Sequence, residues 1–244
     1  MRLPDLRAAG SASTAIALLA RAGWHEIGRG DWSWVYAEQD SELAVRISPW
    51  DPAYALHVQQ CVDHSGNPYL QRIHHIDALG AVGSAVWMER LLPADEARAC
   101  MFCLALGIGS ASNPEWLAQA STTWPADDAA LGQLRSLLAA TLAIGAQTLP
   151  LWGGSDLQPK NVLMDRRGQL KLVDPFFVRG DDIVAALQQG NAAALAGYRA
   201  VELRAFLEIP VFTPGPELDA LRRNLSLLAP SLASRRTPGA APRP

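Results

Sequence analysis

The chain has 244 residues, of which 49% are hydrophobic and 18% are charged, and its formal net charge at pH 7 is -3. A chain of this length buries roughly three quarters of the surface that its unfolded form exposes, which is enough for one domain of two lobes. The small negative charge excludes the basic field that follows a nucleic-acid backbone, so no nucleic-acid partner is expected. The three cysteines, Cys61, Cys100 and Cys103, do not make a disulfide framework.

The first predicted element is a helix over residues 11–22, which stops before Gly23. Its apolar run, residues 14–20, is too short to span a membrane and leads into Arg21. The segment lacks the pattern of an export signal. We therefore expect a cytoplasmic protein with no membrane partner.

A glycine-rich hairpin is predicted next, over residues 27–36. The segment fits the pattern Gly-x-Gly-x-x-Gly-x-Val with one replacement, and its four patterned positions hold Gly28, Gly30, Ser33 and Val35. Glycine lets the backbone of such a turn come close to a ligand. The hairpin is therefore a candidate for phosphate binding.

The following strand, residues 43–47, carries Ala44 and Arg46. Residues two apart on a strand point to the same face, so both side chains are expected on the side of a cleft. A guanidinium group there could grip phosphate oxygens through two of its nitrogens. The other interpretation is that Arg46 is a solvated residue of the strand.

A short helix is predicted over residues 52–62, and it contains no Glu. A side chain that orients Arg46 would then have to be Asp51, Gln60 or Asp63. We expect Asp63, which lies at the far end of this helix, to be that partner.

An apolar strand over residues 84–91 ends the strand-rich part of the chain. We assign residues 1–92 to an N-terminal lobe, residues 93–233 to a helical C-terminal lobe and residues 234–244 to a disordered tail. Leucines at helical spacing predict the central helix of the second lobe over residues 129–147. Three later helices are predicted over residues 181–189, 192–207 and 218–228.

Three polar residues in the second lobe have a spacing suited to phosphoryl transfer. Asp156 is followed five residues later by Asn161, and Asp174 ends the apolar strand 170–173. This strand is expected to pair with residues 162–164 in a hairpin. Either Asp alone fits a turn or a strand end, but together with the Asn they can align a hydroxyl and hold divalent ions on a nucleoside triphosphate.

This segment resembles the catalytic loop and metal-binding strand of the protein-kinase-like fold, a family that includes protein kinases and aminoglycoside or choline phosphotransferases. The kinase pattern His-Arg-Asp, four residues, Asn, and then Asp-Phe-Gly corresponds to Gly154-Ser155-Asp156, four residues, Asn161, and then Asp174-Pro175-Phe176. The resemblance implies an α+β, bilobal fold with a small antiparallel-sheet N-lobe and a reduced helical C-lobe, as in a minimal kinase of bacterial or phage type.

The resemblance also implies what the cofactors and the site residues are. ATP and Mg²⁺ would be the cofactors, and the acceptor would be a hydroxyl of a protein or of a small molecule. Asp156 would be the catalytic base, Lys160 would steady the departing charge, and the metal ligands would be Asn161 and Asp174. The residues implied in nucleotide binding are Gly28, Gly30, Ser33, Val35, Ala44, Arg46, Met88, Glu89, Leu91 and Leu163. Of these, the small Ala44 leaves room for adenine, and the purine would bind to main-chain groups of Glu89 and Leu91.

Three functions follow from the match and its departures. A Ser/Thr protein kinase is favoured by the sequence from Asp156 to Asn161, which is close to protein-kinase catalytic loops. A small-molecule kinase of aminoglycoside or choline type is favoured because no Arg precedes Asp156 and no end of an activation segment is apparent. A nucleotide-binding pseudokinase is favoured by Arg46, which stands where the family has Lys, and by the absence of a Glu in the helix that follows.

Overall fold

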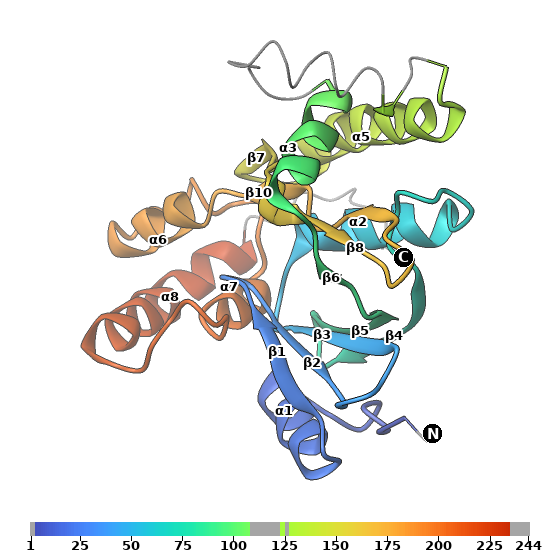
Figure 1. Cartoon of the computed structure of the whole chain (residues 1–244). Helices are drawn as coiled ribbons and strands as arrows, with labels where there is room; N and C mark the ends of the chain where they lie inside the picture. The colour runs from blue at the N-terminus through green and yellow to red at the C-terminus, as the bar shows by residue number, and fades with distance from the viewer. Residues whose placement is uncertain (1–2, 108–122, 125–126, 235–244) are drawn as a thin grey trace.

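The computed structural model describes residues 3–107, 123–124 and 127–234, and they form the two-lobed α+β architecture that the sequence predicts (Figure 1). The N-terminal lobe is built on an antiparallel sheet, and the C-terminal lobe is mainly helical. The tail predicted over residues 234–244 lies outside the described residues except for Ser234, which ends the last helix.

The N-terminal sheet has five strands in the order β1-β2-β3-β5-β4, and all neighbours are antiparallel. The strands are β1 (His25–Arg29), β2 (Trp34–Ala37), β3 (Leu43–Ser48), β4 (Ile73–Leu79) and β5 (Gly83–Glu89). Helix α1 (Ala12–Arg21), the first predicted helix, packs against β3 and β5. Ile47 and Trp87 are buried on that face. Because side chains alternate along a strand, Ala44 and Arg46 point to the opposite face, as predicted.

Helix α2 (Pro52–Asp63) connects β3 to β4 and confirms the helix predicted over residues 52–62. Asp51 caps its first turn by accepting a hydrogen bond from the Tyr54 N–H at 3.0 Å. Pro52 occupies the first helical position, where no N–H is needed. The chain therefore places a carboxylate three residues after the end of β3, directly at the start of the helix.

The C-terminal lobe follows the N-terminal sheet and contains two small sheets, and residues 156–161 connect one small sheet to the other. Its elements are β6 (Leu92–Pro93), α3 (Glu96–Ala105), α5 (Ala129–Thr148), β7 (Trp152–Ser155), β8 (Val162–Met164), β9 (Leu170–Leu172), β10 (Phe176–Val178), α6 (Gly180–Gln188), α7 (Ala200–Phe206) and α8 (Pro216–Ser234). The predicted hairpin is confirmed as β8 and β9, with β6 beside β8. The pairing of β7 with β10 was not predicted.

Helix α5 is the long helix expected over residues 129–147, and it packs against α2 and β7. Among the described residues it is the one helix that is long and apolar enough, by length and composition only, to cross a membrane. Its buried residues include Leu131, Leu134 and Leu138. Only one face of the helix packs into the lobe, since 28% of its apolar window is buried.

The prediction of a helix over residues 192–207 is wrong in its first half, because α7 covers only Ala200–Phe206 and residues 192–198 form turns and a bend. Gly197 lies so close to Pro150 that a Cβ atom at this position would collide with the proline ring. The neighbouring Tyr198 donates its hydroxyl to the carbonyl of Pro150. Packing against this distant segment overrides the helical propensity of the alanines.

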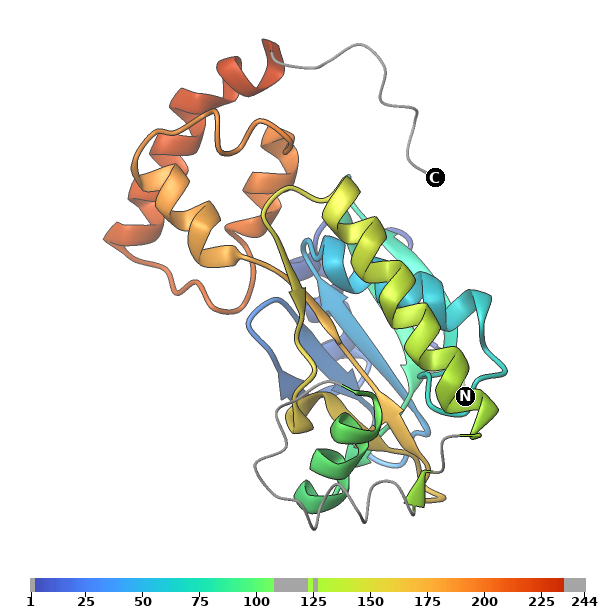
Figure 2. The same ribbon diagram turned by 90° about the horizontal axis from the view of Figure 1, so that it is seen from above.

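Helices α6, α7 and α8 form a group of their own, away from α3 and α5 and next to the hairpin of β1 and β2 (Figure 2). Helix α8 contacts both α6 and α7 and extends beyond the predicted residues 218–228. The glycine-rich hairpin of the first lobe thus faces a wall made by the last helices of the chain.

Candidate active site

Arg46 is a buried residue of the cleft, and the interpretation as a solvated strand residue is wrong. Its relative exposure is 6%. Its Nε donates to Ser33 Oγ at 2.7 Å, and its Nη2 donates to Asp51 Oδ2 at 2.8 Å and to Asp174 Oδ2 at 3.0 Å. The guanidinium carbon lies 3.4 Å from the centroid of the Tyr54 ring. One cation therefore connects the glycine-rich loop, helix α2 and the predicted metal-binding strand.

The carboxylate that orients Arg46 within the N-terminal lobe is Asp51, and the prediction of Asp63 is wrong. Asp63 lies at the other end of α2, where it accepts a hydrogen bond from Gln59 at 2.8 Å. Gln60, the third candidate, donates to the Leu137 carbonyl of α5 at 2.6 Å. A partner at the start of the helix is possible because Asp51 caps Tyr54 with one oxygen and binds Arg46 with the other.

The electrostatics of this cluster keep the guanidinium charged. Burial by itself lowers the pKa of Arg46, but the carboxylates of Asp174 and Asp51 raise the pKa above its ordinary value. Burial raises the pKa of Asp51, and Arg46 opposes that rise. The contact of 2.8 Å between the two groups is that of an ion pair.

Asp156 and Asn161 are held together in the loop between β7 and β8. The Asn161 amide nitrogen donates to the Asp156 carbonyl at 2.7 Å, to Asp156 Oδ2 at 3.0 Å and to the Asp174 carbonyl at 3.1 Å. Gln158 donates to the other carboxylate oxygen of Asp156. The Asp156 N–H donates to the Pro175 carbonyl at 2.7 Å, which ties the loop to the segment that carries Asp174. The structure thus brings together the three residues that the spacing singled out.

Asp174 adopts a left-handed backbone conformation with a φ of 51°, although it is not a glycine. Such a conformation costs on the order of 1 kcal/mol or more, and it persists where surrounding contacts enforce it, often at functional sites. Here the enforcing contacts are the bonds of Asn161 and Asp156 to the main chain of residues 174 and 175. This backbone conformation directs the Asp174 carboxylate toward Arg46.

The residues present fit a magnesium ion bound together with a nucleotide. Mg²⁺ is bound in such sites by one or two protein oxygen ligands and by substrate phosphates. The amide nitrogen of Asn161 is engaged in three hydrogen bonds, so its oxygen is the atom left for a metal. Within the described residues, no group of three or more His, Cys, Asp or Glu side chains could hold a metal by itself. The oxygen ligands of Asn161 and Asp174 therefore suit a Mg²⁺ ion that binds together with the phosphates of a nucleotide.

Lys160 lies beside Asp156, with its Nζ 3.7 Å from Asp156 Oδ2. Its side chain is 66% exposed, so the ion pair contributes little to stability. The exposed ammonium group can turn away from Asp156 toward a phosphate bound in the cleft.

Three of the residues implied in adenine binding lie on one surface. Val35, Ala44 and Met88 pack in one apolar cluster on the cleft face of the sheet, where Ala44 is the register partner of Met88. Leu163 is half-buried on β8, in register with Pro93 of β6. Their role in binding a purine stays a prediction.

The main chain that follows Met88 is less available than predicted. The Glu89 N–H donates to the Arg72 carbonyl at 3.0 Å, and the Arg90 N–H donates to the Glu42 carbonyl at 2.7 Å. The Glu89 side chain accepts from the Arg72 N–H at 2.7 Å and pairs with Lys171 at 3.4 Å. For a purine donor or acceptor, Glu89 can therefore contribute only its carbonyl, and Leu91 remains the other candidate.

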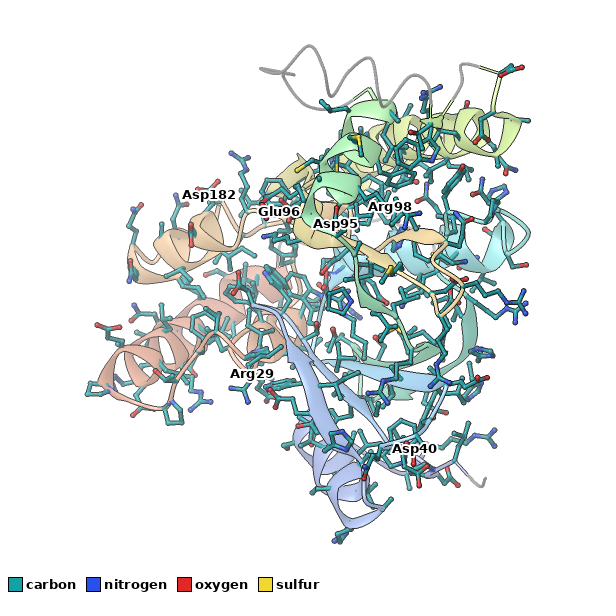
Figure 3. All side chains as sticks on the ribbon, viewed as in Figure 1. Arg29, Asp40, Asp95, Glu96, Arg98 and Asp182 are labelled. Atoms are coloured by element: carbon teal, nitrogen blue, oxygen red, sulfur yellow. The ribbon has the colours of Figure 1, made fainter. Side chains whose placement is uncertain are left out.

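A cavity of about 870 Å³ lies between the two lobes. The predicted residues that line it are Gly30, Ser33, Arg46, Asp156, Lys160, Asn161 and Asp174. Its lining also includes Arg29 of β1 and Asp182 of α6, which are marked in Figure 3. Gly28, Val35, Ala44, Met88, Glu89, Leu91 and Leu163 do not line it. The cavity therefore corresponds to the phosphate and acceptor part of the predicted site, while the predicted adenine surface lies outside it.

Sequence reasoning missed the far wall of this cavity, which comes from residues 177–184 and 206–212. These segments contain no recognisable motif. The one sequence feature that could have indicated this wall is the presence of large apolar residues outside the helices, namely Phe177, Val211 and Phe212.

No protein-family description matches the sequence, and no curated protein matches it. Among solved structures, one of the most similar is an aminoglycoside phosphotransferase from Streptomyces rimosus, with a TM-score of 0.36 and 15% identity over 90% of this chain and 99% of the other. Another is a kinase of the Cydia pomonella granulovirus, with a TM-score of 0.35 and 14% identity over 88% of this chain and 92% of the other. The chain is similar in fold to a phosphotransferase and to a kinase. At these identities the similarity concerns the fold alone.

Proposed function

We propose that this protein is an ATP- and Mg²⁺-dependent phosphotransferase that transfers the γ-phosphoryl group to a hydroxyl. The observation that carries the proposal is the convergence of Asp156, Asn161 and Asp174 in one cavity with the buried cation Arg46, which donates to Asp174 at 3.0 Å. A base, two oxygen ligands for a metal and a phosphate-binding cation are the groups that phosphoryl transfer needs.

In this mechanism Arg46 binds the phosphate oxygens of ATP and the loop around Gly30 covers them. Mg²⁺, when bound, would be held by Asn161 and Asp174 and would neutralise charge on the phosphates. Asp156 orients the acceptor hydroxyl and takes its proton as the acceptor oxygen bonds to the γ-phosphorus. The bond from that phosphorus to the bridging oxygen breaks, ADP departs, and Lys160 steadies the charge.

Two acceptors are compatible with this chemistry: a Ser or Thr hydroxyl of a protein, which the sequence of the catalytic loop favours, and the hydroxyl of a small molecule. The pseudokinase alternative loses part of its support, because Arg46 has a carboxylate partner in Asp51 despite the absence of a helix Glu. Asp51 therefore takes the place of the helix Glu as the carboxylate partner of Arg46.

The test is a transfer assay with radiolabelled ATP, the purified protein, a cell lysate and a panel of small hydroxylated molecules. Label on a lysate protein supports the first acceptor, and label on a small product supports the second. Asp219→Asn serves as the matched control, because it removes an exposed carboxylate of α8 that does not line the cavity. Failure to bind MgATP in calorimetry would overturn the proposal.

A further inference from the structure

Part of the cavity wall is apolar. It includes Trp32, Phe177, Val184, Phe206, Val211 and Phe212. Two of these side chains are large, apolar and exposed: Phe177 at 38% and Val211 at 55%. Apolar surface left open inside a cavity that also holds a few converging polar groups is typical of a site for a small organic ligand.

Phe177 is held beside the catalytic loop by the pairing of β10 with β7. It is in register with Gly154, two residues before Asp156. Its ring lies against Gly153 so closely that a Cβ atom there would collide with it. Both Phe176 and Phe177 line the cavity, but Phe176 is buried in the core at 3% exposure, whereas Phe177 is 38% exposed. The ring is therefore a fixed surface next to the base.

The cavity is bridged on one side by a contact between the two lobes. The Val211 N–H donates to the Asp31 carbonyl at the tip of the glycine-rich loop, at 3.2 Å. The neighbouring Trp32 ring lies 5.2 Å from the ring of Phe206 and 5.7 Å from that of Trp50. A polypeptide that crossed the cavity on this side would have to break these contacts, whereas a small molecule would not.

The size of the cavity also favours a small molecule as the acceptor. Its volume of about 870 Å³ lies in the range for small-molecule sites, and the triphosphate has to occupy the part next to Arg46 and Asp174. The cavity lining also holds Arg29, Asp31, Arg179, Asp181 and Asp182. Arg179 pairs with Asp182 at 3.2 Å, and Arg29 pairs with Glu26 at 2.9 Å. The space beside Phe177 and Val211 is suited to a compact body with an apolar ring.

We propose that the acceptor is a small apolar alcohol with an aromatic or alicyclic ring, held against Phe177 and Val211 with its hydroxyl at Asp156. This inference rests on the proposed phosphotransferase function. It makes Phe177 a residue that determines specificity for the acceptor, and it assigns no contact with ATP to this side chain.

The experiment measures ADP formation with MgATP and three groups of acceptors: ring-bearing apolar alcohols, amino sugars and other polar polyols, and peptides that contain Ser or Thr. We expect turnover with the first group. With such an alcohol, Phe177→Ala should lower kcat/KM by about tenfold or more, the scale for losing an apolar contact in a pocket. Phe177→Leu should recover part of the loss, and the KM for ATP should stay unchanged.

The matched control is Ile76→Ala, which removes an apolar side chain of similar exposure, 44%, from β4 outside the cavity. This variant should behave as the unchanged protein. MgATP binding by calorimetry is measured for all variants, so that the two proposals fail separately. Normal MgATP binding with turnover only on peptides or polyols, or with no turnover on any alcohol, overturns the acceptor inference alone. Absence of MgATP binding overturns the phosphotransferase function and the inference together.

Discussion

Arg46 and Asp174 are joined by a hydrogen bond of 3.0 Å between Nη2 and Oδ2, although 128 positions separate them in the chain. In the structure, the cation predicted to bind phosphate and the carboxylate predicted to bind metal neutralise each other. Binding of MgATP would give each of them a new partner of opposite charge, phosphate for Arg46 and the metal for Asp174. The two lobes are thus connected at the point where the nucleotide has to bind.

Replacement of Arg46 tests its role in phosphate binding. Arg46→Ala is expected to weaken MgATP binding by about 1.5 to 3 kcal/mol, the range for a hydrogen bond to a charged group. Arg46→Lys should recover only part of this, because an ammonium group cannot reach Ser33, Asp51 and a phosphate in the same forked geometry. Adenosine affinity should hardly change in either variant. Calorimetry with both ligands decides the matter, and equal MgATP affinities throughout would show that Arg46 does not contact phosphate.

Replacement of Asp51 tests whether this residue, and not Asp63, is the carboxylate that orients Arg46. Asp51→Asn keeps an acceptor for the helix cap but leaves Arg46 with one carboxylate instead of two. We expect the free energy of unfolding in urea to fall by about 1 to 3 kcal/mol, the cost of weakening a buried charged hydrogen bond. Asp63→Asn is the control and should have little effect, since its partner Gln59 is exposed. Equal losses in both variants would contradict the assignment.

Asp156 is expected to act on the acceptor and not on ATP. Asp156→Asn should lower turnover by roughly a hundredfold or more, the usual scale for a positioned base. MgATP affinity should stay nearly unchanged, because Asn161 and Asp174 remain. Steady-state kinetics and calorimetry on the same preparation give both values. A collapse of MgATP affinity would show that Asp156 is structural or binds metal.

Asp174→Ala is expected to abolish Mg²⁺-dependent transfer while the protein stays folded. Arg46 keeps its contact with Asp51, so the buried cation is still paired in this variant. Circular dichroism checks the fold, and the ADP assay is run over a range of Mg²⁺ concentrations. Unchanged turnover would remove Asp174 from the mechanism.

His57 should make the stability of the protein depend on pH. Its side chain is 1% exposed, and burial lowers its pKa from 6.5 to about 4. Between these two pH values the unfolded chain binds a proton that the folded protein does not, so stability falls as the pH decreases from 6.5 to 4. The loss attributed to this residue is about 3 kcal/mol, since one pKa unit corresponds to about 1.4 kcal/mol.

Urea unfolding at several pH values measures this effect by difference. In His57→Gln the decrease between pH 6.5 and 4 should be smaller by that amount, whatever the other groups contribute. His74→Gln, which changes an exposed histidine of β4, is the control and should keep the decrease of the unchanged protein. Identical profiles for all three proteins would show that His57 does not titrate in this way.

Several parts of the site could be predicted because they depend on short stretches of chain. The alternation of a strand places Ala44 and Arg46 on one face, and the turn between β8 and β9 sets Asn161 and Asp174 side by side. Such relations are fixed by local backbone geometry, since Asn161 and Asp174 are only 13 positions apart. The two-lobed α+β fold was implied by the resemblance to the protein-kinase-like family, which rests on these short motifs.

Other parts were decided only by tertiary structure. Asp51 and Asp63 stand at opposite ends of one helix, and only the packing of α2 against the sheet determines which of them reaches Arg46. The bridge from Asp31 to Val211 likewise joins segments whose sequences give no sign of each other. The sequence by itself determined the groups of the glycine-rich hairpin and of the catalytic loop, because these lie at fixed local spacings. The partners of those groups and the apolar wall they face were decided by contacts between distant segments, whose free energy depends on the packing of the whole chain.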